Sequence, residues 1–306
     1  MADDCIGREV EDMICKMPSG GVLLLENVRF NRGEMACEQE FAKKLAPIAN
    51  YYVNDCFRTS NKPHASNEGV TQYLPGVAGL LMKKELRYLS EDVANVKKPF
   101  HAIVGGSRLS TRIGVIENLF DNKVDVIFFG GGLIFTFLAA AGYSVGSSLV
   151  EENMLRRANL IVSKAIERGV RLVFPADYSR MIVKPGNIHK KFIGLDIGPD
   201  TVSLFSRVLD EAKTIIWNGP MGGFEIAEFA GGTEGIAKKL ANVEEAISTI
   251  IVGGSSAAAV KILGLAEKMT HVSTGGFASL ELLEGIPPSG ICGLQDERRW
   301  VCSEDG

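Results

Sequence analysis

Five runs of apolar, mostly β-branched residues in this chain each stop at a glycine turn and are followed by a helix-like stretch. The turns are Gly105-Gly106, Gly130-Gly131-Gly132, Asn218-Gly219, Gly253-Gly254 and Gly275-Gly276. This pattern is typical of a buried strand, a tight turn, and a helix whose first amides point out of the carboxyl end of the strand. Glycine is also the ordinary residue of any sharp strand-to-helix corner. Five such turns in one sheet nevertheless favour a protein that binds a nucleotide or a phosphorylated substrate.

Length and composition fit a large α/β protein. The chain has 306 residues, enough for two domains or one large α/β unit. An apolar fraction of 46% suits parallel strands that helices cover on both faces. The net charge is −4 with Lys and Arg spread along the chain, which implies neither nucleic acid nor an anionic membrane as a partner. No stretch reaches about 18 consecutive apolar residues, so we expect no transmembrane span and a cytoplasmic location. The scattered cysteines have no zinc-ligand spacing and are expected to be reduced.

The chain divides into three predicted parts. Residues 1–81 hold two strand candidates, GGVLLLENVRF and NYYVNDCF, around a helix-like QEFAKKLAPIA, and two strands make a poor sheet on their own. The helix-like LMKKELRYLSEDVANV leads into residues 82–285, which contain all five glycine turns and are predicted to form one doubly wound parallel sheet. Glu151 to Arg168 is predicted to be a helix and GVRLVFP a further strand. Residues 286–306 are rich in Pro and Gly and then charged, which indicates a tail.

Longer motifs identify a family. LLLENVRF, YYVNDCF, KPHAS, LMKKELRYL, FFGGGLIFTFL, VGSSLVEEN, GLDIGPDT, IIWNGPMGGFE, EGIAKKLA and STGGFASLELLEG occur in order, and together they resemble phosphoglycerate kinase, most closely its plant forms. The resemblance runs from Asp4 to about Gly290. It implies two Rossmann-like domains hinged about a central helix, with phosphoglycerate on the first and Mg-nucleotide on the second. It also implies reversible phosphoryl transfer between 1,3-bisphosphoglycerate and ADP, as in glycolysis or the Calvin cycle.

The resemblance begins late in the family's sequence. A family member has a further segment upstream that carries side chains for phosphoglycerate and an Arg that stabilises the transferring phosphoryl group. Phosphoryl transfer depends on positioning and on positive charge around the moving group, so we expect impaired activity for the chain as given. Within the chain, Lys62 and Lys98 stand where the family has arginines that bind the substrate phosphate. Lysine keeps the charge but lacks the bidentate fork of arginine.

The nucleotide site implied by the resemblance lies in the second part. The family turn Gly-Gly-x-Lys, with a second Lys four residues on, appears here with Gly106, Arg108 and Arg112. A spacing of four predicts that both cations lie on the first turns of one helix face, near the nucleotide phosphates and the moving phosphoryl group. Two such arginines without the preceding glycines would be typical of a solvated helix face. The resemblance also places Gly253, Gly254, Gly275 and Gly276 at the catalytic turns, the last two being followed by Phe277 where the family has a third glycine.

The remaining expected contacts concern Mg²⁺, adenine and ribose. The family aspartate that engages Mg²⁺ is Ser255 here, followed by Ser256, and a neutral hydroxyl is a poor magnesium ligand. The resemblance therefore implies ATP or ADP as ligand with weak dependence on Mg²⁺. Gly130, Gly131 and Gly132 would form the floor of the adenine pocket and Gly194 would lie nearby. Asn218, Gly219 and Pro220 would form its wall, while Glu225 would accept from the ribose hydroxyls. A carboxylate such as Glu225 would otherwise be typical of an exposed first helical turn.

Three functional interpretations follow. The first is a working phosphoglycerate kinase of which this chain is a part, to be found in the cytoplasm as given or in a plastid for a longer precursor. The second is a catalytically inactive paralogue that binds nucleotide and serves as a scaffold or regulatory protein with a protein partner. The third, an NAD-dependent dehydrogenase, is disfavoured because no G-x-G-x-x-G precedes an acidic strand end.

Overall fold

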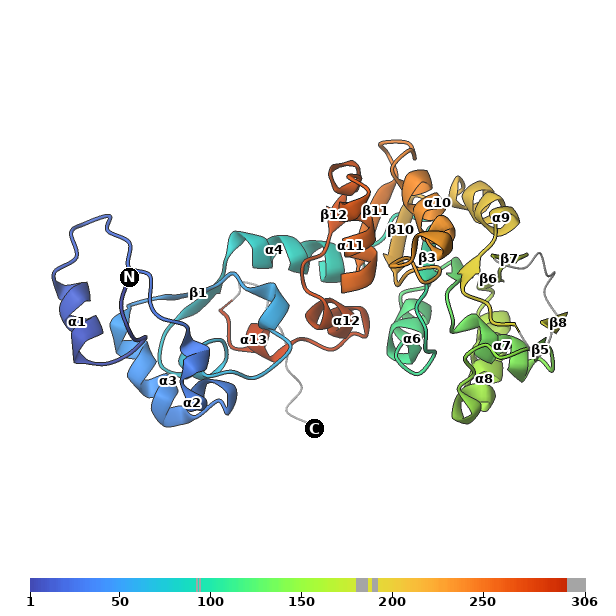
Figure 1. The fold of residues 1–306 in the computed structure, drawn as a ribbon. Helices are drawn as coiled ribbons and strands as arrows, with labels where there is room; N and C mark the ends of the chain where they lie inside the picture. Colours follow the sequence, from blue (N-terminus) through green and yellow to red (C-terminus); the bar gives the residue numbers. More distant parts are fainter. Residues whose placement is uncertain (92, 94, 180–186, 189–191, 296–306) are drawn as a thin grey trace. The chain divides into compact units, whose positions relative to one another are not determined.

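The computed structural model describes residues 1–91, 93, 95–179, 187–188 and 192–295 (Figure 1). The chain forms two compact units. The first comprises Met1–Leu86 together with Ile286–Gly306, and the second comprises Arg87–Gly285. Among the described residues, no helix is both long enough and apolar enough to cross a membrane.

The second unit is built on a six-stranded sheet in which every pair of neighbours is parallel. The strand order is β12-β11-β10-β3-β4-β6. The bounds are β3 Phe100–Val104, β4 Val126–Phe129, β6 Arg171–Val173, β10 Thr214–Asn218, β11 Ser248–Val252 and β12 His271–Val272. All five predicted glycine-turn strands and the GVRLVFP strand are present. The prediction of an α/β fold with a doubly wound parallel sheet is confirmed.

Both faces of this sheet are buried. Every residue of β3, β4 and β10 is buried, as expected for central parallel strands. On one face, Trp217, Ile215 and Ile103 pack with apolar residues of α9 (Pro199–Leu209), α10 (Gly231–Leu240) and α11 (Gly254–Ile262). Phe129 faces the other side and packs against Phe137 of α7 (Ile134–Ala140). Further helices of the unit are α6 (Ile113–Asp121), η6 (Glu152–Met154), α8 (Leu155–Glu167), η7 (Ala227–Phe229), η8 (Ala266–Lys268) and α12 (Phe277–Leu283).

The direction of winding reverses at the centre of the sheet. From β3 the chain builds outward through β4 to β6, and it then returns to β10, which pairs with the other side of β3, before building outward through β11 to β12. Ligands of such sheets bind at the carboxyl ends of the strands, at this reversal point. Two short ladders complete the unit, β5 (Ser144–Val145) with β8 (Asn187–Ile188) and β7 (Tyr178–Ser179) with β9 (Asp196–Ile197).

The first unit contains less regular structure. Its only described ladder pairs β1 (Tyr52–Asn54) with β2 (Gly76–Ala78) in parallel, so the strand predicted from NYYVNDCF is present. Its helices are α1 (Arg8–Cys15), η1 (Val28–Phe30), α2 (Arg32–Met35), α3 (Gln39–Leu45), η2 (Ala46–Ile48), η3 (Phe57–Thr59), η4 (Gly69–Gln72), α4 (Leu80–Leu86) and α13 (Ser289–Cys292). Beyond α4 the chain continues into the π-helical η5 (Arg87–Glu91) of the second unit, where one helix was predicted.

The strand predicted from GGVLLLENVRF does not form. Residues 21–27 have no regular structure, and Val28–Phe30 form a 3₁₀ turn. The segment meets the amino-terminal residues at only two backbone bonds, from the Ala2 amide to the Leu24 carbonyl (2.9 Å) and from the Glu26 amide to the Asp4 carbonyl (3.4 Å). The Val and Leu run has β propensity, but no neighbouring strand pairs with it, so it does not form a strand.

Part of the predicted tail packs against the first unit. The Gly290 amide donates to the Ser60 carbonyl (2.8 Å), Asn54 donates to the Gly290 carbonyl (3.0 Å), and Ile291 is buried. Residues 296–306 of that predicted tail lie outside the described residues. Cys292 is disulfide-bonded, whereas Cys5, Cys15, Cys37 and Cys56 are free, so the expectation of reduced thiols holds for those four only.

The reversal point leads to a prediction about Gly219. Its φ is +94°, and a Cβ there would clash with the backbone of Gly105. We expect Gly219→Ala to lower the free energy of unfolding by about 3 kcal/mol or more, because two turns would have to separate. Gly264 is the matched control, since its φ is +67° and a Cβ there would meet nothing within 4 Å. Gly264→Ala should cost about 1 kcal/mol. Equal losses in urea unfolding followed by circular dichroism would contradict this account.

Candidate functional site

A cavity of about 420 Å³ lies at the reversal point, on the carboxyl side of the sheet. Three of its walls come from the turns after β3, β4 and β10, and a fourth comes from the segment around Gly194. The lining residues are Gly106, Ser107, Arg112, Gly131, Gly132, Phe135, Leu149, Ile193, Gly194, Leu195, Pro220, Gly222, Gly223, Glu225 and Ser255.

Some of the turn glycines are needed because the turns contact one another. The Gly105 amide donates to the Asn218 carbonyl (2.8 Å), and the Gly106 amide donates to the Pro220 carbonyl (2.9 Å). A Cβ on Gly105 or Gly219 would clash with the backbone of the opposite turn, and one on Gly131 would clash with Gly106. These glycines therefore serve the packing of loops and would be required whether or not a ligand binds.

Other glycines have open space where a Cβ would lie, and of these Gly223 lines the cavity. A Cβ on Gly223 would meet no atom closer than 3.8 Å, and one on Gly254 or Gly276 would meet nothing within 4 Å. Gly276 has a φ of +55° and precedes α12, where Phe277 is 73% exposed. A ligand can approach the backbone closely at such positions, which is the requirement for a phosphate bound at a glycine-rich turn.

Arg112 supplies positive charge to the cavity. Its guanidinium donates through Nε to the Gly105 carbonyl (3.1 Å) and through Nη1 to the Thr111 carbonyl (3.1 Å). Burial lowers the pKa of Arg112, an effect that Glu284 opposes by its negative charge, and the guanidinium stays ionised at neutral pH. It lies against Gly106, where a Cβ would be 3.1 Å from Nη2.

Arg108 and Arg112 do not share a helix face as predicted. The helix α6 begins at Ile113, Arg112 is its N-cap residue, and Arg108 is an exposed loop residue. The loop stays non-helical because Gly106 has a φ of +109° and a turn joins the Arg112 amide to the Leu109 carbonyl (2.8 Å). Arg108 is not among the residues that line the cavity.

The two serines at the start of α11 lie in different environments. Ser255 is exposed and lines the cavity, two residues after Gly253, whose φ is +92°. Ser256 is fully buried; its hydroxyl accepts from the Gly219 amide (2.7 Å) and donates to the Val252 carbonyl (3.1 Å). Ser256 therefore joins α11 to the turn after β10 and has no access to the cavity.

Several predicted site residues do not line the cavity. Asn218 is buried and donates to the Val252 carbonyl (3.1 Å), while its Oδ1 has no hydrogen-bond partner among the described residues. A Cβ on Gly130 would clash with Met221. The Gly275 amide donates to Ser273 Oγ (3.2 Å). The residues in this group are Arg108, Gly130, Asn218, Gly253, Gly254, Ser256, Gly275 and Gly276.

The apolar side of the cavity was missed by sequence reasoning. Leu149 is 44% exposed and Ile193 is 48% exposed, and both line the cavity with Leu195 and the buried Phe135. The Gly194 amide donates to Ser148 Oγ (3.0 Å), which ties the two segments that carry these side chains. Exposed apolar residues around a cavity suit a flat apolar ligand group. In sequence, the only signal was the position of Leu149 and Ile193 inside or beside the motifs VGSSLVEEN and GLDIGPDT.

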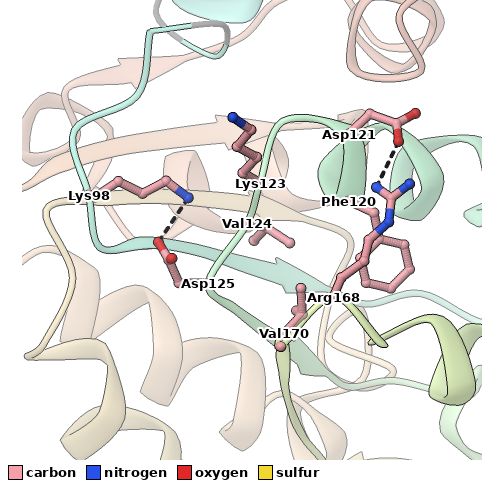
Figure 2. A pocket seen from close by; sticks show the side chains of 9 residues that line it. Lys98, Phe120, Asp121, Lys123, Val124, Asp125, Arg168 and Val170 are labelled. Atoms are coloured by element: carbon pink, nitrogen blue, oxygen red, sulfur yellow. Dashed lines mark hydrogen bonds and ion pairs between the residues drawn. The ribbon is translucent and has the colours of Figure 1, made fainter. Parts of the chain in front are cut away.

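A larger cavity of about 710 Å³ lies at the amino-terminal ends of the strands (Figure 2). Its charged side chains largely pair with one another: Lys98 Nζ lies 3.1 Å from Asp125, and Arg168 Nη1 lies 2.8 Å from Asp121. Lys98 precedes β3, so the length of that strand separates it from Gly106. The structure therefore does not bring Lys98 together with the other predicted site residues of this unit.

Lys62 belongs to the first unit and is exposed in the loop of KPHAS. A buried carboxylate holds this loop: Glu34 accepts from the Ser66 amide (2.9 Å) and hydroxyl (2.6 Å). Asn67 donates to the Lys62 carbonyl (3.0 Å). The Lys62 backbone is thus fixed, and the residue is exposed.

No cluster of three or more His, Cys, Asp or Glu residues that could hold a metal ion occurs in the part of the chain that the structure describes. Glu225, in the turn before η7, is the one carboxylate among the described residues that line the cavity. A divalent cation in the cavity would consequently need its ligands from a bound nucleotide, from water and from hydroxyls such as that of Ser255.

The comparisons with known proteins agree with this geometry. The family model described as phosphoglycerate kinase matches residues 1–286. The cytosolic phosphoglycerate kinase of Nicotiana tabacum is 56% identical over 308 residues, which are 97% of this chain and 77% of that protein. Phosphoglycerate kinase 1, chloroplastic, of Arabidopsis thaliana is 53% identical over 307 residues, 96% of this chain and 64% of that protein. The structure of phosphoglycerate kinase from Coxiella burnetii has a TM-score of 0.81 at 38% identity, covering 88% of this chain and 71% of that one.

The sheet with its cavity at the reversal point defines an α/β protein of the nucleotide-binding class. The chain belongs to the phosphoglycerate kinase family. Proteins of this family bind a nucleotide and phosphoglycerate, and they use ATP or ADP with Mg²⁺.

Arg112 and Arg108 are predicted to contribute differently to the affinity for ADP. Arg112→Ala should weaken ADP binding by about tenfold, because a partly buried cation next to the glycine turns is lost. Arg108→Ala removes the same charge from an exposed loop outside the cavity and should change ADP affinity by less than about twofold. Isothermal titration calorimetry of both variants, with adenosine as a ligand without phosphate, measures the difference. A larger loss for Arg108→Ala would mean that the loop rearranges on binding.

Proposed function

We propose that the cavity binds ADP or ATP and that the chain carries out phosphoryl transfer between 1,3-bisphosphoglycerate and ADP at an impaired rate. Membership of the family and the position of the cavity support nucleotide binding. The observation that carries the impairment is Ser255, which lines the cavity where the family has an aspartate. Lys62 is proposed to bind the phosphate of phosphoglycerate.

The two ends of the cavity suit the two ends of a nucleotide. Leu149, Ile193 and Leu195 form an apolar side that would cover adenine, with Gly194 allowing close approach. Glu225 would accept from the ribose hydroxyls. Gly131 and Gly132, expected beneath the adenine, both line the cavity. A planar apolar group with a few polar contacts at its edge is the usual content of such a pocket.

The phosphates would lie toward Arg112 and the start of α11. The amides of Gly254 and Ser255 belong to the first turn of α11, where backbone N–H groups have no partner within the helix. Together with the guanidinium they provide positive charge for an anion. Gly253, Gly275, Gly276 and Arg108 are proposed to act during transfer and do not line the cavity.

The protein offers only weak ligands for Mg²⁺ at this site. Mg²⁺ prefers anionic oxygen and near-ideal octahedral geometry, and the Ser255 hydroxyl is neutral. A bound ion would mainly neutralise phosphate charge and orient the phosphates, so weaker engagement by the protein lowers the rate of transfer more than the affinity for nucleotide.

A coupled assay of ATP-dependent phosphorylation of 3-phosphoglycerate tests the proposal. We expect slow turnover by the parent chain and an increase of about tenfold in kcat for Ser255→Asp, because an anionic ligand for Mg²⁺ is restored in the cavity. Ser203→Asp, on an exposed position of α9, is the control for an added negative charge. Thermal melting with and without ADP confirms that each protein is folded and binds nucleotide.

The results of the assay distinguish a kinase impaired at Ser255 from a nucleotide-binding scaffold. Fast turnover by the parent that Ser255→Asp leaves unchanged would contradict the role given to Ser255. A folded chain that binds ADP equally well with Mg²⁺ and with chelator, yet shows no turnover in either form, would favour the nucleotide-binding scaffold. A chain that binds no adenine nucleotide would overturn the proposal altogether.

We also propose that the protein acts in the cytoplasm. The relatives include cytosolic and chloroplastic kinases at similar identity, 56% and 53%. Imaging of the tagged protein in plant cells tests this, and accumulation in plastids would contradict it.

A further inference from the structure

A buried carboxylate lies behind the wall of the cavity. Asp196 of β9 is 4% exposed, and its two oxygens each accept one backbone hydrogen bond. Oδ2 accepts from the Gly232 amide in the first turn of α10 (2.7 Å), and Oδ1 accepts from the Ile197 amide (2.9 Å). Asp196 therefore fixes the start of α10 to β9.

The glycine turn of the cavity packs directly on this carboxylate. A Cβ on Gly222 or on Gly232 would clash with Asp196 Oδ1. Gly222 lines the cavity, so one side of this residue faces the cavity and the other touches the carboxylate. Any displacement of the Asp196 side chain would therefore move Gly222 and change the cavity wall.

Two further bonds connect the same elements. The Gly223 amide donates to the Leu195 carbonyl (2.9 Å), and both residues line the cavity. The Met221 amide donates to Thr233 Oγ1 on α10 (3.0 Å). The segment 221–223 is thus held between β9 and the start of α10, the two elements that Asp196 joins.

We infer that Asp196 is a positioning residue for nucleotide binding, which holds the turn 221–223 and the start of α10 in the geometry that the cavity requires. The inference rests on the proposed binding of adenine nucleotide in this cavity. Asp196 does not line the cavity, so its effect passes through Gly222 and Gly223.

The ionisation of Asp196 gives this role a measurable signature. Burial raises the pKa of Asp196 to about 6, while the hydrogen bonds from Gly232 and Ile197 act in the opposite direction. The elements around it carry several ionisable groups, none of which is among the causes of this shift: Asp177 and Tyr178 at β7, Glu225 and Glu228 in the cavity loop, and Glu234, Lys238 and Lys239 on α10.

Two pH effects of opposite sign follow. The raised pKa means that the folded protein binds more protons than the unfolded chain between about pH 4 and 6, so this group lowers stability as the pH rises through that window. Nucleotide affinity should instead rise with pH, because the ionised carboxylate accepts both backbone bonds. If binding requires the ionised form, affinity at pH 5 is about tenfold below its value at neutral pH.

Asp177 provides a matched control. Its carboxylate accepts from the amides of Thr201 (2.7 Å) and Asp200 (3.2 Å) at the start of α9, and a Cβ on Gly198 would clash with it. The arrangement repeats that of Asp196, with a carboxylate that joins a helix start and packs on a glycine. None of the residues in this second arrangement lines the cavity.

The experiment measures the dissociation constant of ADP from pH 5 to 7.5 for the purified parent chain, Asp196→Asn and Asp177→Asn. At pH 7.5 we expect about tenfold weaker binding for Asp196→Asn and less than a twofold change for Asp177→Asn. The ratio of Asp196→Asn to parent should fall toward one at pH 5, since the parent then carries a protonated Asp196. Titration of the ADP phosphates is common to all three proteins and cancels in the ratios.

A second variant tests the inference if Asp196→Asn does not fold. Gly222→Ala keeps the ionisable carboxylate but pushes it away from the turn and strains its bond to the Gly232 amide, so ADP binding should weaken. The inference is overturned if the variants at Asp196 and Asp177 behave alike, if the ratio does not change with pH, or if Gly222→Ala binds ADP as the parent does. Absence of ADP binding by the parent at every pH would overturn the proposed function and this inference with it.

Discussion

The cavity depends on direct backbone contact between the turns that follow β3 and β10. These strands are neighbours in the sheet but lie far apart in the sequence, so the contact forms only when both halves of the second unit have folded. Gly105 and Gly219 are in such close contact that a Cβ on either would clash with the opposite turn. The Ser256 hydroxyl accepts a hydrogen bond from the Gly219 amide. The contact between the turns after β3 and β10 therefore also determines the shape of the cavity that these turns line.

Two kinds of glycine occur side by side in these turns. Gly105, Gly131 and Gly219 allow one backbone to touch another, whereas Gly223, Gly254 and Gly276 leave space that a ligand could fill. A sequence pattern of paired glycines does not distinguish the two, because the distinction depends on which loop lies opposite. The pattern predicted an edge of the sheet where a cavity does lie, whereas Gly130, to which the resemblance gave a ligand contact, packs on the side chain of Met221.

The sequence predicted the parallel sheet well, because strands such as VDVIFF and STIIV are buried on both faces and read as continuous apolar runs. It failed where tertiary partners decide the outcome. The LLLEN segment has strand propensity but no ladder, and Arg108 lies outside the helix that the spacing of four had predicted. Leu149, Ile193 and Asp196 gave no signal of their own, because their roles arise from loops that meet only in the folded unit.

Four of the positions at which the resemblance implies a departure from the family follow strands of the parallel sheet. Arg108 and Arg112 follow β3, Ser255 follows β11 and Phe277 follows β12, and of these four residues Arg112 and Ser255 line the cavity. The turns are joined by glycines in backbone contact and by buried polar groups such as Ser256 and Asp196. In the proposed function, adenine binding depends on the contacts between turns, whereas transfer depends on positive charge around the phosphates. A chain with these departures can therefore retain the fold and the affinity for nucleotide while it loses rate.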